Sequence, residues 1–446
     1  MAEGSVIRLV DSAAHPLTGA AQDYDPLLQM IGDARLVLLG EASHGTHEFY
    51  LTRAEITQRL IDEKGFNAVA VEADWPDAFR VNRWVRGVSE DADSRTALDG
   101  FRRFPTWMWR NTEVVSFIER LRAHNAALPP DAPTAGFYGL DLYSLNTSIA
   151  AVLNYLDRVD PEAARRARYR YACFEHFGDD VQAYGYAANF GLTESCENEA
   201  VSQLVELRRH AADYASRDGR VAADEFFFAE QNARLVINAE EYYRVMFRSS
   251  AESWNLRDRH MAETLDALLR HLSAQIGRPA KVVIWEHNSH LGDARATYMA
   301  RQGQLNVGQL VRQQYGSEAV LVGFTTYTGT VTASSEWDAP AERKRVRPGL
   351  PRSYEALFHE AEHDRFLLNL RDNEQLSAAL RGPLLERAIG VIYLPQTERL
   401  SHYFDAELSR QFDVVMHFDE TRALEPLERT PQWEAGEPPE TYPSGL

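Results

Sequence analysis

Short, largely apolar runs recur along the chain and constrain its fold more than any other feature of the sequence. They are residues 36–39, 68–71, 136–140, 282–285, 320–324, 390–394 and 414–418. Continuous apolar runs of this length are typical of strands that are buried on both faces. Stretches with helical periodicity lie between them, at residues 49–64, 114–127, 149–156 and over much of 199–274. The pattern predicts an α/β fold with a mostly parallel central sheet flanked by helices.

The chain, with 446 residues, is long enough for more than one structural unit. Residues 161–275 contain no convincing strand, and we interpret them as a helical insertion or cap beside the active site. They separate a first half of the α/β core, residues 1–160, from a second half, residues 276–425. Periodicity leaves open whether the insertion is a separate lobe or lies against the sheet. Residues 426–446 gather Pro, Glu and Gly and predict a loose C-terminal tail.

Charge and hydropathy exclude several classes of partner. The formal net charge of −19 repels phosphate backbones and anionic headgroups, so we expect no nucleic-acid binding. The apolar runs fall far short of the roughly 20 residues that cross a membrane. The N-terminal residues do not resemble a secretory signal, which favours a cytoplasmic location.

The chain has two cysteines, Cys173 and Cys196. We expect both to be free thiols without a role. The sequence leaves the oligomeric state open.

Ionisable residues follow the first four apolar runs directly. These segments are Gly40 to Glu48, Glu72 to Asp77, Asp141 alone, and Glu286 to His290. Ligands of open α/β sheets bind outside the carboxyl ends of the strands. If the four strands are neighbours, these side chains converge on one pocket, where burial and like charge shift pKa values. The sequence therefore predicts one shared active site.

A histidine beside carboxylates is suited to take a proton from water near neutral pH. His44, with Glu41 or Glu72 to orient its ring, fits that role. Trp107 and Trp109, in the segment 104–111, form either an exposed substrate-binding wall or part of the core. No dinucleotide-binding or phosphate-binding glycine motif and no nucleophile elbow are present, so we expect no nucleotide cofactor and a water nucleophile rather than a serine.

Two histidine pairs leave a metal site open as an alternative. They are His44 with His47 and His287 with His290, which together with Glu41 or Glu72 have ligand types suited to Zn²⁺ or Fe²⁺. The chain has no HExxH motif, and we favour a site without a metal or other cofactor. Helix capping or substrate contact are the other interpretations of His47 and His290.

At these segments the sequence resembles the erythromycin esterase family, which includes macrolide-inactivating enzymes and relatives linked to succinoglycan biosynthesis. The matching segments are LLGEASHGTHEFY (38–50), VAVEADWPDAFRVN (69–82), FPTWMWRN (104–111), GFYGLDLYS (136–144) and WEHNSHLGD (285–293). Residues 401–404 and 411–413 are also similar to the family's C-terminal part. The resemblance implies a hydrolase that opens a macrolide lactone, and thereby inactivates an antibiotic, without a metal.

The resemblance also implies roles for individual residues. His44 matches the histidine that deprotonates water, and Glu41 and Glu72 match its companion carboxylates. The remaining matches are Arg53, a nearby arginine, and the histidine pair His287 and His290. Arg53, His287 or His290 would then stabilise the oxyanion of the tetrahedral intermediate. Arg257, in the helical insertion, either reaches the pocket to bind substrate or forms a surface salt bridge.

Other functions stay open beside the macrolide esterase. The same machinery would serve another ester or amide, such as an acylated sugar or a secondary metabolite, because specificity lies in variable loops. A metal-dependent hydrolase and a haem-type binding protein are the remaining alternatives. Under each hydrolase hypothesis, the binding partner of the protein is a small-molecule substrate.

Overall fold

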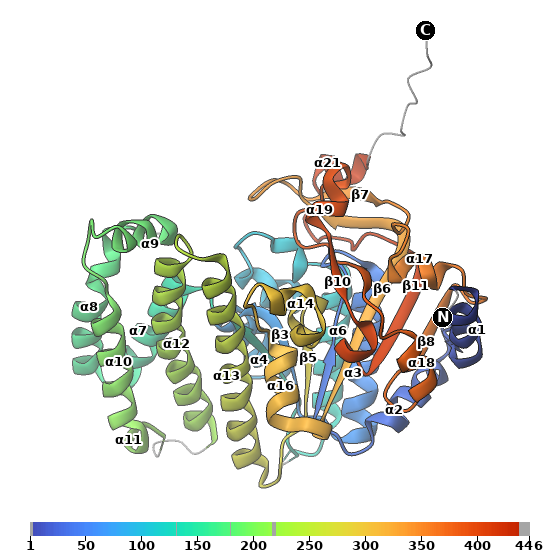
Figure 1. The fold of residues 1–446 in the computed structure, drawn as a ribbon. Helices are drawn as coiled ribbons and strands as arrows, with labels where there is room; N and C mark the ends of the chain where they lie inside the picture. Colours follow the sequence, from blue (N-terminus) through green and yellow to red (C-terminus); the bar gives the residue numbers. More distant parts are fainter. Residues whose placement is uncertain (1–2, 131, 179, 216–219, 437–446) are drawn as a thin grey trace.

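The computed structural model describes residues 3–130, 132–178, 180–215 and 220–436, and within them the fold is α/β (Figure 1). A nine-stranded sheet runs in the order β1-β8-β11-β6-β2-β5-β3-β4, with β7 paired to β6. The strands are β1 His15–Pro16, β2 Leu36–Leu39, β3 Ala68–Asp74, β4 Gly136–Asp141, β5 Val282–Trp285, β6 Ala319–Ala333, β7 Glu342–Val346, β8 Arg365–Asn369 and β11 Val414–Thr421. β9 Leu384–Arg387 and β10 Tyr403–Ala406 form a separate antiparallel pair.

The centre of the sheet is parallel, as the sequence predicts. The pairs β11–β6, β6–β2, β2–β5, β5–β3 and β3–β4 are all parallel, whereas β8, β1 and β7 add antiparallel pairs. Successive residues of a strand point to opposite faces. In β2, Leu36 and Leu38 therefore enter one apolar core while Val37 and Leu39 enter the other. Both faces are covered, which explains why these strands are continuous apolar runs.

Helices cover the two faces of the sheet (Figure 1). The helices before β5 are α1 Glu3–Ala13, α2 Asp25–Ile31, α3 His47–Lys64, α4 Trp75–Val85, α5 Ser94–Ala97, α6 Thr112–Ala127, α7 Leu145–Val159, α8 Pro161–Glu175, α9 Val181–Asn189, α10 Glu197–Arg209, α11 Ala211–Ala215, α12 Arg220–Val245 and α13 Ser250–Ile276. Those after it are α14 Asn288–Leu291, α15 Tyr298–Arg301, α16 Val307–Tyr315, α17 Tyr354–His359, α18 Glu374–Ala379, α19 Glu398–Ser401, α20 Leu408–Gln411 and α21 Pro431–Ala435. Apolar residues of α2, α3 and α6 fill one core, and those of α7, α12, α13 and α16 fill the other.

The described residues of the segment 161–275 form helices and no strand, as the sequence predicts. These helices stack beside the sheet, at the left of Figure 1. The longest of them, α13, packs against β4 and α16, and one apolar cluster is continuous from the sheet into α13. Ser249 caps the start of α13, and Gly277, with φ of 68°, ends it. The packing of α13 on β4 brings the middle of this helix close to the end of β4.

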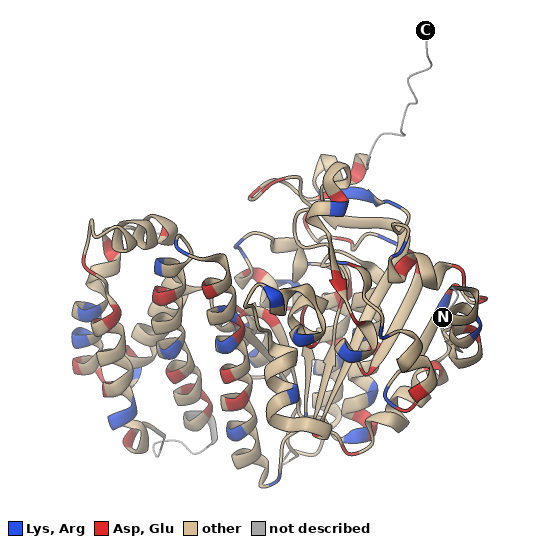
Figure 2. Cartoon of the chain, in the orientation of Figure 1, with Lys and Arg blue, Asp and Glu red and all other residues tan. Residues whose placement is uncertain are grey.

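Charged side chains of both signs are interspersed along these helices (Figure 2). Arg166, for example, binds Glu206 at 2.6 Å, and Arg234 binds Glu263 at 3.2 Å. Exposed pairs of this kind contribute about 0–1 kcal/mol each. The charge of these helices is therefore largely paired and does not by itself mark a binding surface.

Two sequence expectations are wrong. Residues 390–394 form no strand: Ile392 makes a single bridge to Ser334, the preceding Ile389 makes a single bridge to Ser43, and no continuous ladder develops. Cys173 and Cys196 are not free thiols but are joined in a disulfide that links α8 to the start of α10.

The C-terminal segment and the helices allow two further observations. Residues 426–436, expected as part of a loose tail, include helix α21, whose Trp433 is buried and donates a hydrogen bond to Thr332. The rest of that tail lies outside the described residues. In the part of the chain that the structure describes, no helix is long and apolar enough to span a membrane.

Candidate active site

The order of the parallel strands decides which loops meet. β2, β5, β3 and β4 are neighbours in that order, so the residues after them lie along one edge of the sheet. The turn after β2 is packed tightly against other backbone, because a Cβ atom at Gly45 would lie 1.8 Å from the carbonyl oxygen of Thr332. Only glycine fits at that position. The turn places Glu41 and His44 at the same edge as Glu72 and Asp141.

His44 is held by a buried ion pair behind it. Its Nδ1 lies 2.9 Å from Oε1 of Glu41, and the other oxygen of Glu41 accepts a hydrogen bond from Nη2 of Arg53 at 2.7 Å. Glu41 is 2 % exposed and Arg53 is fully buried. Because Oε1 of Glu41 is the acceptor in this contact, Nδ1 carries the proton and Nε2 keeps its lone pair. This is the tautomer that a general base requires at Nε2.

Glu72 is paired with an arginine from the helical segment. Nη2 of Arg257, in α13, lies 2.7 Å from Oε1 of Glu72 and 2.7 Å from Oδ2 of Asp141. The backbone N–H of His287 donates to the second oxygen of Glu72 at 2.9 Å. Burial acts to raise the pKa of Glu72, but the charges of His290 and Arg257 outweigh it and hold that pKa well below its usual range. Glu72 is therefore an anion at neutral pH.

His287 is a neutral imidazole next to the base. Its ring centroid lies 4.8 Å from that of His44. Burial, with the neighbouring His44, lowers its pKa to about 3 against the opposing effect of Glu72. Its Nδ1 accepts a hydrogen bond from the backbone N–H of Ser289 at 3.2 Å, so the proton lies on Nε2, and the backbone of Ala42 is a hydrogen-bond partner of the ring. His287 is therefore a neutral imidazole that packs beside His44 without lining the cavity.

His290 lies deeper in the protein. Its Nδ1 donates to Asp258 at 2.9 Å, and Trp254 stacks on its ring with a centroid separation of 4.4 Å. Burial acts to lower its pKa, but Asp258 and Glu72 raise it above the usual value. His290 thus contacts Glu72 on the side away from the cavity.

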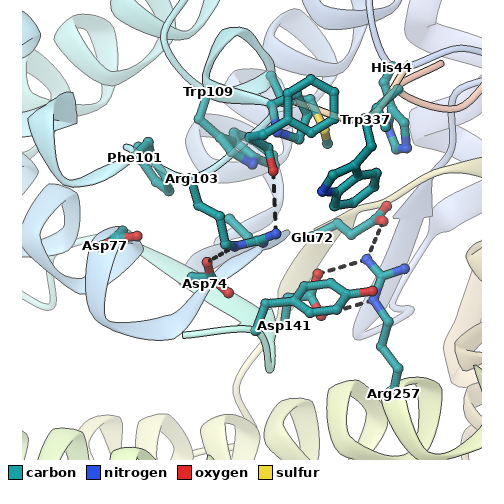
Figure 3. Close-up of a pocket in the computed structure, with 16 residues that line it drawn as sticks. His44, Glu72, Asp74, Asp77, Phe101, Arg103, Trp109, Asp141, Arg257 and Trp337 are labelled. Atoms are coloured by element: carbon teal, nitrogen blue, oxygen red, sulfur yellow. Dashed lines mark hydrogen bonds and ion pairs between the residues drawn. The ribbon is translucent and has the colours of Figure 1, made fainter. Parts of the chain in front are cut away.

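A cavity of about 200 Å³ opens onto these groups. Figure 3 shows His44, Glu72, Asp141 and Arg257 around one part of it and Asp74, Asp77, Phe101 and Arg103 around another. Arg103 donates to Asp74 at 3.0 Å. Trp337, in the loop between β6 and β7, lines the cavity although its side chain is 54 % exposed.

The residues singled out from the sequence fall into three groups. His44, Glu72, Trp109 and Arg257 line the cavity. The residues that lie behind them and contact them are Glu41, Arg53, His287 and His290. Trp107 is buried in the apolar core and does not line the cavity.

Several residues of the site were given no role from the sequence. Asp74 and Asp77 lie in a segment that was recognised, directly after a strand, so a signal for them existed. Tyr143 likewise follows a strand closely. Arg103 and Asp258 had no such signal, because Arg103 lies in a loop and Asp258 within a long helix, far along the chain from the residues that they contact.

The four histidines of the two pairs do not form one site, although His44 and His287 lie side by side. His47 is bound to Glu113, and His290 is bound to Asp258. Among the residues that the structure describes, no group of three or more His, Cys, Asp or Glu side chains is arranged to hold a metal ion.

Comparisons with known proteins agree with this fold. The family model "Erythromycin esterase" matches residues 61–421. Erythromycin esterase type II of Escherichia coli is 25% identical over 328 residues, which are 70% of this chain and 73% of the relative. A crystal structure of a Bacillus cereus protein superposes with a TM-score of 0.78 at 21% identity, covering 96% of this chain and 100% of the other. An erythromycin esterase mutant in its open conformation gives a TM-score of 0.67 at 17% identity, covering 90% and 94%.

The α/β fold and the pocket at the strand ends, with these matches, define a hydrolase that acts on ester bonds. The chain belongs to the erythromycin esterase family, as the sequence motifs predicted.

Proposed function

We propose that this protein hydrolyses a carboxylic ester, in particular a macrolide lactone, by means of a water molecule that His44 activates without a metal. The observation that carries the proposal is the cavity-lining His44, whose Nδ1 is bound to buried Glu41 at 2.9 Å. A cytoplasmic location and a role in resistance to macrolides belong to the same proposal.

The reaction begins with proton transfer from water to Nε2 of His44. The water oxygen attacks the carbonyl carbon of the ester and forms a tetrahedral intermediate. Glu41 stabilises the imidazolium that results, and Arg53 orients Glu41. His44 then returns the proton to the departing alkoxide, the bond between the carbonyl carbon and that oxygen breaks, and an acid and an alcohol are released.

The negative charge of the intermediate requires donors that face the cavity. The guanidinium of Arg257 is the group of the right chemistry that lines the cavity close to His44 and Glu72, whereas His287 lies behind His44. Arg53 is fully buried behind Glu41 and His290 lies behind Glu72, which supports positioning roles for both. Removal of one oxyanion donor typically lowers kcat by about 10²–10³-fold.

The test uses chelator-treated protein with a panel of macrolides and simple esters, beside the His44→Ala variant. We expect each hydrolysed substrate to gain the mass of one water, and we expect the activity to survive the chelator and to be lost in the variant. Loss of activity on chelation would instead indicate a metal-dependent hydrolase. Activity that persists in the variant would refute His44 as the base.

The size of the cavity favours a second candidate, a hydrolase of a smaller ester or amide such as an acylated sugar. About 200 Å³ is less than the roughly 300–1,000 Å³ of typical small-molecule sites. A macrolide therefore requires the cavity to open, whereas a small ester does not. Turnover of simple esters without turnover of macrolides would favour this candidate.

A further inference from the structure

Arg53 is a buried charge with a single ionic contact. The residue is fully buried, and within the described part of the chain its guanidinium makes one ion pair, from Nη2 to Oε2 of Glu41 at 2.7 Å. A guanidinium has five N–H donors and binds a carboxylate most firmly through two of them in parallel. A contact at one nitrogen alone leaves the group free to turn about that contact. Further interactions are therefore needed to fix the orientation of Arg53.

Two aromatic rings supply such interactions. The guanidinium carbon of Arg53 lies 4.4 Å from the ring centroid of Tyr50 and 5.1 Å from that of Trp285. The face of an aromatic ring attracts a cation, and the attraction is strongest where both groups are removed from water. Tyr50 and Trp285 are buried, so these contacts lie in the dry interior. The hydroxyl of Tyr50 interacts with the same guanidinium.

The surrounding elements hold both rings in place. Tyr50 and Arg53 lie three positions apart in α3, which places them on one face of that helix. Trp285 ends β5, and its indole N–H donates at 2.9 Å to Oγ1 of Thr57, about one turn further along α3. Phe117, in α6, packs on the indole with a centroid separation of 4.7 Å. The rings are thus anchored by contacts that do not involve Arg53.

A ring can hold a cation without offering it a competing anion. Glu41 has to bind both Arg53 and His44 through its two oxygens. A second carboxylate beside Arg53 would draw the guanidinium away from Glu41 and add negative charge next to the base. Neutral rings do neither. The contact from Nη2 to Glu41 is then the dominant one, and Glu41 stays aligned on Nδ1 of His44.

We propose that Tyr50 and Trp285 are positioning residues of the hydrolysis, whose rings hold Arg53 against Glu41 and thereby keep His44 oriented as the base. The part of this inference that concerns catalysis rests on the proposed function. Both side chains lie outside the described lining of the cavity. Any effect of either ring on turnover is therefore expected to pass through Arg53.

The kinetic test removes the rings and then restores them. We expect Trp285→Leu and Tyr50→Leu to lower kcat for a hydrolysed ester by about 10–30-fold with little change in KM, in line with the loss of a desolvated cation–π contact. Trp285→Phe and Tyr50→Phe keep a ring face and should retain most of kcat. In an Arg53→Met background, Trp285→Leu should lower kcat little further, because the ring then has no guanidinium to hold.

The matched control is Trp84→Leu. Trp84, in α4, is also buried and also has a guanidinium over its ring, that of Arg122 at 4.6 Å, but it lies outside the described lining of the cavity. We expect this control to lower stability without a loss of kcat. Equal losses of kcat in Trp84→Leu and Trp285→Leu would overturn the inference, because the ring would then be merely structural. Equal losses in Tyr50→Phe and Tyr50→Leu would overturn the role of the Tyr50 ring.

A measurement without substrate separates this inference from the esterase proposal. The probe is the set of guanidinium N–H resonances of Arg53 in ¹⁵N-arginine-labelled protein, identified by their absence from Arg53→Met. Ring currents shield protons above a ring face, so we expect a downfield shift of these resonances in Trp285→Leu and none in Trp84→Leu. That result supports the ring contacts even if no ester is hydrolysed. Unchanged resonances in Trp285→Leu, or shifted resonances with full kcat, overturn the inference and leave the esterase proposal standing.

Discussion

At the scale of single residues, Glu41 connects the catalytic histidine to the protein interior. Its two oxygens bind His44 and Arg53, and Nε and Nη1 of Arg53 have no hydrogen-bond partner. Glu41→Gln keeps the size of the side chain but leaves the Arg53 charge buried without a counterion. We expect the free energy of unfolding to fall by about 3 kcal/mol, because a buried charge loses its partner. We expect kcat to fall by about 10²-fold, because the imidazolium is no longer stabilised.

Urea unfolding and single-turnover kinetics measure the two effects of Glu41→Gln separately. The matched control is Glu113→Gln, which removes a buried carboxylate bound to the histidine outside the cavity, His47. We expect this control to lower stability without a comparable loss of kcat. Equal losses of kcat in both variants would contradict the role of Glu41.

At the scale of elements, the loop between β6 and β7 brings Trp337 to the cavity. Its ring lies 5.0 Å from that of Phe104, yet half of its surface is exposed. A substrate can cover that free surface. We expect Trp337→Ala to raise KM for large apolar esters by about tenfold, in line with the loss of a partly buried aromatic side chain, and to leave an acetate ester unaffected. Trp337→Phe should retain most of the affinity. Faster turnover of large esters by the alanine variant would show that Trp337 obstructs the cavity instead.

The sequence predicted elements best where one physical constraint decides the residue types. β2 and β5 are buried on both faces, so nearly every residue is apolar and the runs 36–39 and 282–285 are recognisable. β7, whose sequence is ERKRV, pairs only with β6, has no such constraint and was missed. Glu41 and His44 were predictable because they adjoin a strand. Arg257 lies within a 27-residue helix, and only the packing of α13 on β4 brings it to the site.

At the scale of the whole molecule, the helical segment and the sheet share one apolar core. Leu268, in α13, is fully buried in the cluster that also contains Leu36 and Ile284 of the sheet. We expect the helical segment and the sheet to unfold together, because neither buries this face without the other. Leu268→Ala should lower the free energy of unfolding by about 2–5 kcal/mol and shift a single calorimetric transition to lower temperature. Tyr169→Ala, at a side chain that is 86 % exposed in α8, should have little effect. A separate early transition in the Leu268 variant, with the sheet still folded, would show that the two parts are independent.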